Sequence, residues 1–175
     1  MRKLGETDIA NKTIALRVDL NVPIKDENVL DDTRILAILP TLEYLEKKAA
    51  KVLLLSHFGR PEPGKFNVDF SLRPVGKRLA ELLGKQIPFF KSLEDVNFDH
   101  DIGLLENTRF LAGELENDED LSGRLANLAE VYIFDAFGTS HRAHASTHGA
   151  IYASSLSCAG LLLENEIEAL KKATR

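Results

Sequence analysis

The chain has 175 residues, of which 44% are hydrophobic and 28% charged, and its formal net charge is −5. This composition is that of an ordinary globular protein, and it excludes disordered and fibrous classes. The acidic balance disfavours binding to a nucleic-acid backbone, and the one cysteine, Cys158, excludes an internal disulfide. No apolar run approaches the roughly 18 residues of a membrane span, and no signal peptide follows Met1. We expect a cytoplasmic protein whose partners include neither nucleic acid nor membrane.

Five short apolar runs are typical of strands buried on both faces, because they are too short for helices and do not alternate with polar residues. Stretches of helical periodicity separate them, which is the pattern of βαβ units. We therefore predict a mostly parallel sheet with helices on both faces. The runs are Thr13–Val18, Val52–Leu55, Gln86–Phe90, Ile102–Leu105 and Val131–Phe134.

The first helix is predicted after Asp32, a residue type that caps helix N-termini. Its apolar residues recur every three or four positions from Ile35 to Leu45. Pro40 lies inside this pattern and lacks an amide donor, so we predict a kink there. Two more amphipathic helices are predicted over 72–83 and 117–128, the second with an acidic start that suits the helix dipole.

The last segment also has helical periodicity, at Leu163, Ile167 and Leu170, and no stop signal precedes Arg175. We interpret 161–175 as the start of a longer helix and 1–160 as one compact domain.

Charged residues follow four of the five predicted strands. Ligands of parallel α/β sheets bind beyond the carboxyl ends of the strands, so these residues are candidates for a site. Together they would form a positive region in an acidic chain, which suits a small polyanion. The alternative is that the arginines form structural ion pairs with Asp19, Glu106 or Asp135. The basic candidates are His57, Arg60, Arg109, His141 and Arg142.

Arg34 is a separate candidate because it lies in the first turn of the predicted helix, where a cation opposes the helix dipole. Beside the free amides of that turn, its guanidinium would help to bind an anion. The alternative is a surface ion pair with Asp31 or Asp32.

Four other patterns are weaker. Residues 59–66 have the spacing of a phosphate-binding loop, but Phe66 replaces the metal-binding hydroxyl and two prolines remove amide donors. The histidines at 141, 144 and 148 lack a fourth zinc ligand, so we expect no metal. The Ser-His pairs at 56–57 and 140–141 lack the G-x-S-x-G turn of a hydrolase. Nothing electropositive adjoins Cys158, which we expect to be packed.

Taken together, six segments resemble those of the phosphoglycerate kinases and occur in the family's order. The resemblance runs from residue 17 to residue 166 and covers the amino-terminal, phosphoglycerate-binding half of that family. It implies a three-layer, Rossmann-like α/β domain, in which 161–175 begins the interdomain helix. It covers no part of the nucleotide-binding half, so Mg-ADP and Mg-ATP are expected to bind outside this chain, which itself carries no cofactor. The segments are R-V-D-L-N-V-P, D-D-T-R-I, S-H-F-G-R-P, L-L-E-N-T-R-F, D-A-F-G-T-S-H-R-A-H-A-S-T and C-A-G-L-L-L-E-N-E.

The resemblance also implies roles for individual residues. Arg34 corresponds to the catalytic arginine, near the carboxyl or acyl-phosphate end of the substrate, where it steadies the phosphoryl group in transfer. Asp19 and Asn21 hold the region of the glycerate hydroxyl. The 3-phosphate binds to a basic patch made of His57, Arg60, Arg109 and Arg142. Phosphoryl transfer depends mainly on positioning and charge stabilisation, which agrees with a cluster of arginines.

The implied activity is the glycolytic, reversible transfer of a phosphoryl group from 1,3-bisphosphoglycerate to ADP, which gives 3-phosphoglycerate and ATP. The chain by itself is expected to bind substrate without turnover, as a monomer that works with its own carboxy-terminal nucleotide domain. A binding module without catalysis and a P-loop nucleotide hydrolase are the alternatives. Two residues depart from the family pattern: Phe134 could alter the orientation of Asp135, and Asn165 could alter the charge near the interdomain helix.

Overall fold

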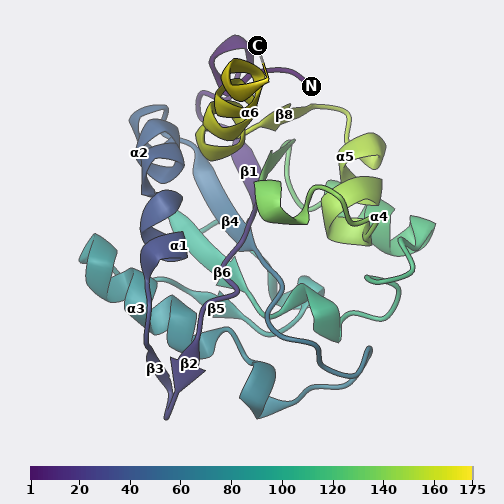
Figure 1. Cartoon of the computed structure of the whole chain (residues 1–175). Helices are drawn as coiled ribbons and strands as arrows, with labels where there is room; N and C mark the ends of the chain where they lie inside the picture. Colours follow the sequence, from purple (N-terminus) through teal and green to yellow (C-terminus); the bar gives the residue numbers. More distant parts are fainter. Residues whose placement is uncertain (175) are drawn as a thin grey trace.

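The computed structural model describes residues 1–174, and its centre is a six-stranded sheet in the order β5-β6-β4-β1-β7-β8 (Figure 1). Every neighbouring pair in this sheet is parallel, as predicted. All five predicted strands are present, although the third is reduced to two residues. The strands are β1 (Thr13–Val18), β4 (Lys51–Leu55), β5 (Phe89–Phe90), β6 (Ile102–Leu105), β7 (Val131–Asp135) and β8 (Ser157–Ala159).

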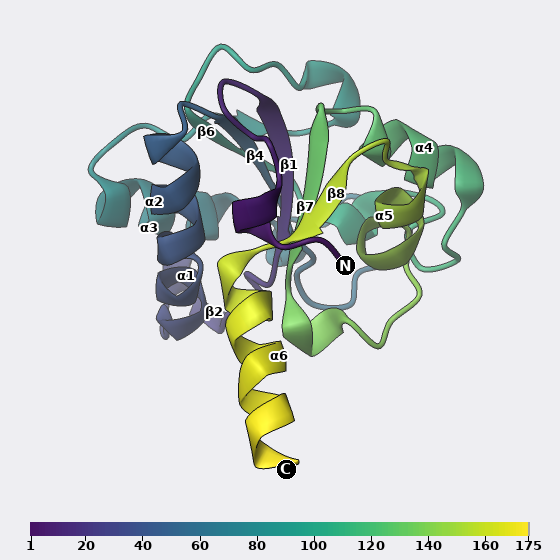
Figure 2. The same cartoon turned by 90° about the horizontal axis from the view of Figure 1, so that it is seen from above.

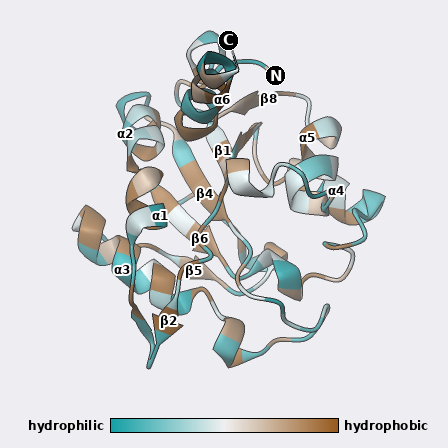
Figure 3. Cartoon of the chain, in the orientation of Figure 1, coloured by the Kyte–Doolittle hydropathy of each residue, from teal (hydrophilic) through white to brown (hydrophobic). Residues whose placement is uncertain are grey.

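Helices cover both faces of the sheet and complete the three layers (Figure 2). Alternate residues of a strand serve opposite faces, so Leu16 packs with α1, α2 and α3, whereas Ala15 packs with α4 and α5. Figure 3 shows hydrophobic residues running along the strands, with hydrophilic residues in the surrounding helices and loops. The helices are α1 (Thr33–Ala37), α2 (Leu39–Lys47), α3 (Arg73–Leu83), α4 (Glu119–Ala126), α5 (Ala150–Ala153) and α6 (Leu161–Ala173).

The predicted kink at Pro40 is a break between two helices. α1 ends at Ala37, and α2 begins at Leu39 with Pro40 in its first turn, where a missing amide donor costs nothing. The expected cap is partly wrong. Asp32 lies at the N-cap of α1 without a capping bond, and the carboxylate of Asp31 instead accepts from the Thr33 N–H at 2.9 Å.

Several short elements were not predicted from the sequence. Strand β8 is one, and an antiparallel hairpin of β2 (Ile24–Lys25) and β3 (Asn28–Val29) is another. A π-helical turn covers Ala145–Gly149. The short 3-10 helices are Leu4–Glu6, Val68–Phe70, Leu93–Asp95, Thr108–Phe110 and Phe137–Thr139. None of the helices in the described part of the chain has the length and apolar character needed to cross a bilayer.

α6 projects away from the sheet in Figure 2, and its N-terminus is fixed by buried acceptors. The carboxylate of Asp135 accepts from the Leu163 N–H at 2.8 Å and from the Thr41 hydroxyl at 2.6 Å. Asp135 is therefore well held although Phe134 precedes it. The helix predicted over 161–175 is present to Ala173, and Arg175 lies outside the described residues.

Candidate functional site

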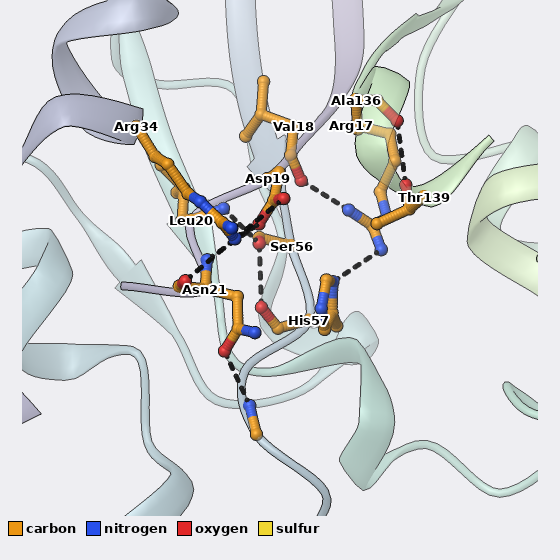
Figure 4. A network of polar contacts seen from close by, with 11 residues as sticks. Arg17, Val18, Asp19, Leu20, Asn21, Arg34, Ser56, His57, Ala136 and Thr139 are labelled. Atoms are coloured by element: carbon orange, nitrogen blue, oxygen red, sulfur yellow. Dashed lines mark hydrogen bonds and ion pairs between the residues drawn. The ribbon is translucent and has the colours of Figure 1, made fainter. Parts of the chain in front are cut away.

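The loops that leave β1, β4 and β6 at their carboxyl ends are joined by side-chain hydrogen bonds. The hydroxyl of Ser56 accepts from the Leu20 N–H and donates to the His57 carbonyl oxygen, both at 2.9 Å (Figure 4). The Asn107 Oδ1 accepts from the Phe58 N–H, also at 2.9 Å. Ser56 therefore links two loops, and its hydroxyl donates to the His57 backbone and not to the His57 ring.

Asp19, Asn21 and Arg34 form the first part of the site. Nη1 of Arg34 reaches back from α1 and lies 3.1 and 3.0 Å from the two Asp19 carboxylate oxygens. The same nitrogen donates to the Asn21 carbonyl oxygen at 3.0 Å, and Asn21 Oδ1 accepts from the Gly59 N–H at 3.0 Å. The alternative surface pair of Arg34 with Asp31 or Asp32 is wrong.

Arg17 lies beneath these loops and was not predicted as a site residue. It belongs to a strand with both faces buried, and it is itself only 1% exposed although it is charged. Its Nε donates to the Ser146 hydroxyl at 2.8 Å. Its Nη1 donates to the Val18 carbonyl oxygen, and its Nη2 lies 3.2 Å from His57 Nδ1 (Figure 4). A cation buried inside a core strand needs such partners. The place of Arg17 within the apolar run Thr13–Val18 was therefore the sequence signal that could have identified it.

His57 is a buried imidazole among arginines. Burial, followed by the charges of Arg17, Arg109 and Arg142, lowers the pKa of His57 from 6.5 to about 2. The side chain is therefore neutral over the physiological range. It can donate or accept a hydrogen bond but adds no positive charge to the site.

Three arginines form the second part of the site. Burial and the nearby charges of Arg142, Arg17 and Arg60 lower the pKa of Arg109. The three arginines of this part therefore lie near one another and near Arg17, in one cluster of guanidinium groups. Arg109 donates to the Gly59 carbonyl oxygen, and its Nε is buried without a partner. Among the ion pairs of residues 1–174, none involves Arg60, Arg109 or Arg142.

The acids proposed as structural partners are engaged elsewhere. Asp19 pairs with Arg34, and Asp135 holds α6. Glu106 accepts from the Ser71 hydroxyl at 2.6 Å and from the Leu72 N–H at 2.8 Å, which fixes the start of α3. The structural ion-pair interpretation of Arg60, Arg109 and Arg142 is therefore wrong, and their charges remain available to a ligand.

The other histidines of the same region differ in their placement. His144 lies close to the arginine cluster. Burial and then the charges of Arg109, Arg142 and Arg17 lower its pKa. His141 is exposed, and His148 packs on the ring of Tyr152. Over the described residues, His, Cys, Asp and Glu side chains form no group suited to a metal ion. Cys158 is buried, and burial raises its pKa to about 11, so it is packed and unreactive.

The segment 59–66 does not form a phosphate-binding loop. Lys65 pairs with Glu62 at 2.7 Å, and the ring of Phe66 packs edge-on against Phe110 with a centroid distance of 5.3 Å. A 3-10 turn follows at Val68–Phe70 in place of the helix that such a loop requires.

The chain is thus a three-layer α/β domain with a cluster of arginines at the carboxyl edge of its parallel sheet, which is where ligands of this class of fold bind. The family model for phosphoglycerate kinase matches residues 4–175. The chain belongs to the phosphoglycerate kinase family.

Individual relatives agree with this assignment. The chain is 48% identical over 171 residues to a phosphoglycerate kinase of Desulfovibrio desulfuricans and 49% identical over 180 residues to one of Thermosipho africanus. The fold is similar to that of the Coxiella burnetii phosphoglycerate kinase, with a TM-score of 0.94 and 42% identity, and that of the Pyrococcus horikoshii enzyme, with 0.85 and 31%. The alignments cover 97–99% of this chain but only 44–45% of these proteins. The chain thus spans less than half the length of its relatives.

Proposed function

We propose that the chain is the phosphoglycerate-binding half of a glycolytic phosphoglycerate kinase. In that enzyme a phosphoryl group is transferred reversibly from the acyl phosphate of 1,3-bisphosphoglycerate to ADP, giving 3-phosphoglycerate and ATP. The observation that carries the proposal is the cluster of Arg60, Arg109 and Arg142 without acid partners, in a chain whose net charge is −5. Such a cluster attracts a small, multiply charged anion.

The two parts of the site bind different parts of the substrate. The 3-phosphate binds to His57, Arg60, Arg109 and Arg142, where guanidinium groups can form charge-assisted hydrogen bonds. The glycerate hydroxyl lies toward Asp19 and Asn21. The bond from Gly59 to Asn21 ties the loop that carries His57 and Arg60 to the loop after β1, so that one small ligand contacts both.

Arg34 serves the reacting end of the substrate. Its side chain is 54% exposed and stands at the rim of the site, with Nη1 directed to Asp19. A guanidinium there stabilises the charge on the phosphoryl group during transfer. In the reverse direction the acceptor is the carboxylate of 3-phosphoglycerate, which has a pKa of about 4 and is ionised at neutral pH, so no general base is required.

The nucleotide is assigned to the part of the kinase beyond this chain. The segment 59–66 offers no phosphate cradle, and the chain spans only 44% of its Desulfovibrio desulfuricans relative. When bound there, Mg-ADP supplies the acceptor phosphate. Closure of the two domains would exclude water that otherwise hydrolyses the acyl phosphate. We further propose that the enzyme is a cytoplasmic monomer and that this chain alone does not turn over.

A reconstitution assay tests the proposal. The chain is joined to the nucleotide-binding domain of the Desulfovibrio desulfuricans relative, and ATP formation from 1,3-bisphosphoglycerate and Mg-ADP is measured. We expect turnover from the joined protein and none from either part. A folded joined protein that binds 3-phosphoglycerate without turnover would instead indicate a binding module, and a chain that hydrolyses ATP alone would indicate a P-loop enzyme.

A further inference from the structure

The contact between Arg17 and His57 fixes the position of a proton. A guanidinium has only N–H donors and stays protonated in proteins. Arg17 Nη2 lies 3.2 Å from His57 Nδ1, so the hydrogen bond between them requires Nδ1 to accept. A neutral imidazole that accepts at Nδ1 carries its proton at Nε2.

We propose that Arg17 is a positioning residue that holds His57 as its neutral Nε2–H tautomer, so that the site presents a fixed N–H donor to an anionic ligand. The identity of that ligand rests on the proposed function, whereas the tautomer does not. Among the described residues, Nε2 has no protein partner and is not one of the fully buried unpartnered atoms. This nitrogen is therefore the one left open to a ligand.

The guanidinium of Arg17 cannot turn away from His57, because its other nitrogens are engaged. Nε donates to the Ser146 hydroxyl at 2.8 Å, and Nη1 donates to the Val18 carbonyl oxygen. Ser146 in turn donates from its hydroxyl to Glu114 Oε1 at 2.7 Å and from its backbone N–H to the same atom at 3.0 Å. A buried hydroxyl thus links a buried cation to a buried carboxylate.

Glu114 supplies the charge that this arrangement needs. It is 1% exposed, and its charge is the strongest of those that counteract the effect of burial on Arg17. A fully buried guanidinium without a nearby anion would carry a large desolvation cost. The chain from Glu114 through Ser146 to Arg17 therefore keeps Nη2 against His57 whether or not a ligand is bound.

A neutral donor suits this place better than an imidazolium. A second proton, on Nδ1, would face the N–H of Arg17, and the resulting charge would lie among Arg17, Arg109 and Arg142, with His144 also near. Glu114 and Asp19 are the acids whose charges reach Arg17. An Nε2–H group can donate to a phosphate oxygen without these penalties, and its protonation does not change as the pH varies near neutrality.

Nitrogen-15 NMR of the histidine-labelled, ligand-free chain tests the proposal between pH 5 and 8. We expect His57 to show one tautomer, with Nδ1 unprotonated and Nε2 protonated, and no titration. In Arg17→Met we expect a second tautomer or a titration of His57 to appear, because the donor is lost. Tyr132→Phe is the control: the Tyr132 hydroxyl donates to the Ser146 carbonyl oxygen at 2.6 Å, so the variant removes a hydrogen bond of the same segment but none of the hydrogen bonds of Arg17 or His57. Its His57 signals should match those of the native chain.

Either of two results would overturn the proposal. One is a native His57 that carries its proton on Nδ1 or titrates near 6.5. The other is a folded Arg17→Met chain with unchanged His57 signals. If this variant does not fold, the native spectrum still decides. Because no ligand is present, these results are independent of whether 3-phosphoglycerate binds, which separates failure of the tautomer from failure of the proposed function.

Discussion

Arg34 and Asp19 form an ion pair at 3.0 Å across the rim of the site. In this arrangement the charge of Arg34 is partly satisfied before any ligand arrives. A contact between Arg34 and the phosphoryl group in transfer would therefore be made mainly in the transition state, and such contacts affect kcat more than binding.

The first prediction concerns Arg34→Ala in the joined, two-domain kinase. We expect kcat to fall by about 10²–10³, as when one stabilising donor is removed, with a smaller rise in KM. Steady-state kinetics measures both. Arg78→Ala is the matched control, because Arg78 pairs with Asp32 and Glu81 outside the site. A rise in KM with unchanged kcat would show that Arg34 only binds the ground state.

The second prediction concerns the arginines without acid partners. Arg60→Ala and Arg142→Ala should each weaken 3-phosphoglycerate binding by about 1.5–3 kcal/mol, the value of a hydrogen bond to a charged group. Calorimetry measures this change. Arg124→Ala removes an arginine of α4 that pairs with Glu94, and it should leave the affinity unchanged. Unaltered binding in both site variants would contradict the assignment of Arg60 and Arg142 to the 3-phosphate site.

The third prediction concerns acid stability. The pKa of His57 is about 2 in the folded chain, against an ordinary value of 6.5 for the unfolded chain, so below pH 6.5 the unfolded state binds the extra proton. The free energy of unfolding should therefore fall as the pH falls from 6.5, by up to about 1.4 kcal/mol per unit for this residue. His100 and His144, whose pKa values are also lowered, act in the same direction.

Urea unfolding at pH 7, 6 and 5 measures this slope. In His57→Gln, where the amide oxygen can still accept from Arg17, we expect a smaller loss of stability between pH 6.5 and 5. An identical slope in the variant and the native chain would contradict the assignment of a neutral His57.

The fourth prediction concerns the start of α6. A Cβ on Gly160 would lie 2.2 Å from Asp135 Cγ, a buried group that already holds Thr41 and Leu163. Gly160→Ala should therefore lower stability by about 1–3 kcal/mol through overpacking. Gly123→Ala is the control: it lies within α4 with no atom within 4 Å of its added Cβ, and it should raise stability by about 0.5–1 kcal/mol. Equal effects on the thermal midpoint would contradict this description of α6.

The sequence predicted those parts of the fold that depend on local pattern. β1, β4, β6 and β7 are continuous apolar runs, and their directions follow from the helices between them. β8 was missed because Ser157–Ala159 is short and made of small residues, and it becomes a strand only by pairing with β7. Pro40 was correctly read as an interruption, since its effect is confined to its own turn.

The site was predictable to the extent that strand ends carry it. His57, Arg60, Arg109 and Arg142 could be predicted to lie together because parallel strands end at one edge, whereas Arg34 was singled out by its place in the first turn of a helix. The partners of these residues could not, because they come from distant segments. Asp19 pairs with Arg34, which lies 15 positions further along the chain, and Arg17 binds Ser146, which lies 129 positions further along. Arg17 itself was missed because it lies inside a strand.

The central claim is that this chain carries a phosphoglycerate site, and a calorimetric titration tests it most directly. The chain is titrated with 3-phosphoglycerate at two salt concentrations, and with Mg-ADP for comparison. We predict saturable binding in the micromolar to millimolar range, about −8 to −4 kcal/mol, that weakens with salt and has no counterpart for Mg-ADP. A folded chain that binds Mg-ADP and not 3-phosphoglycerate would contradict the claim.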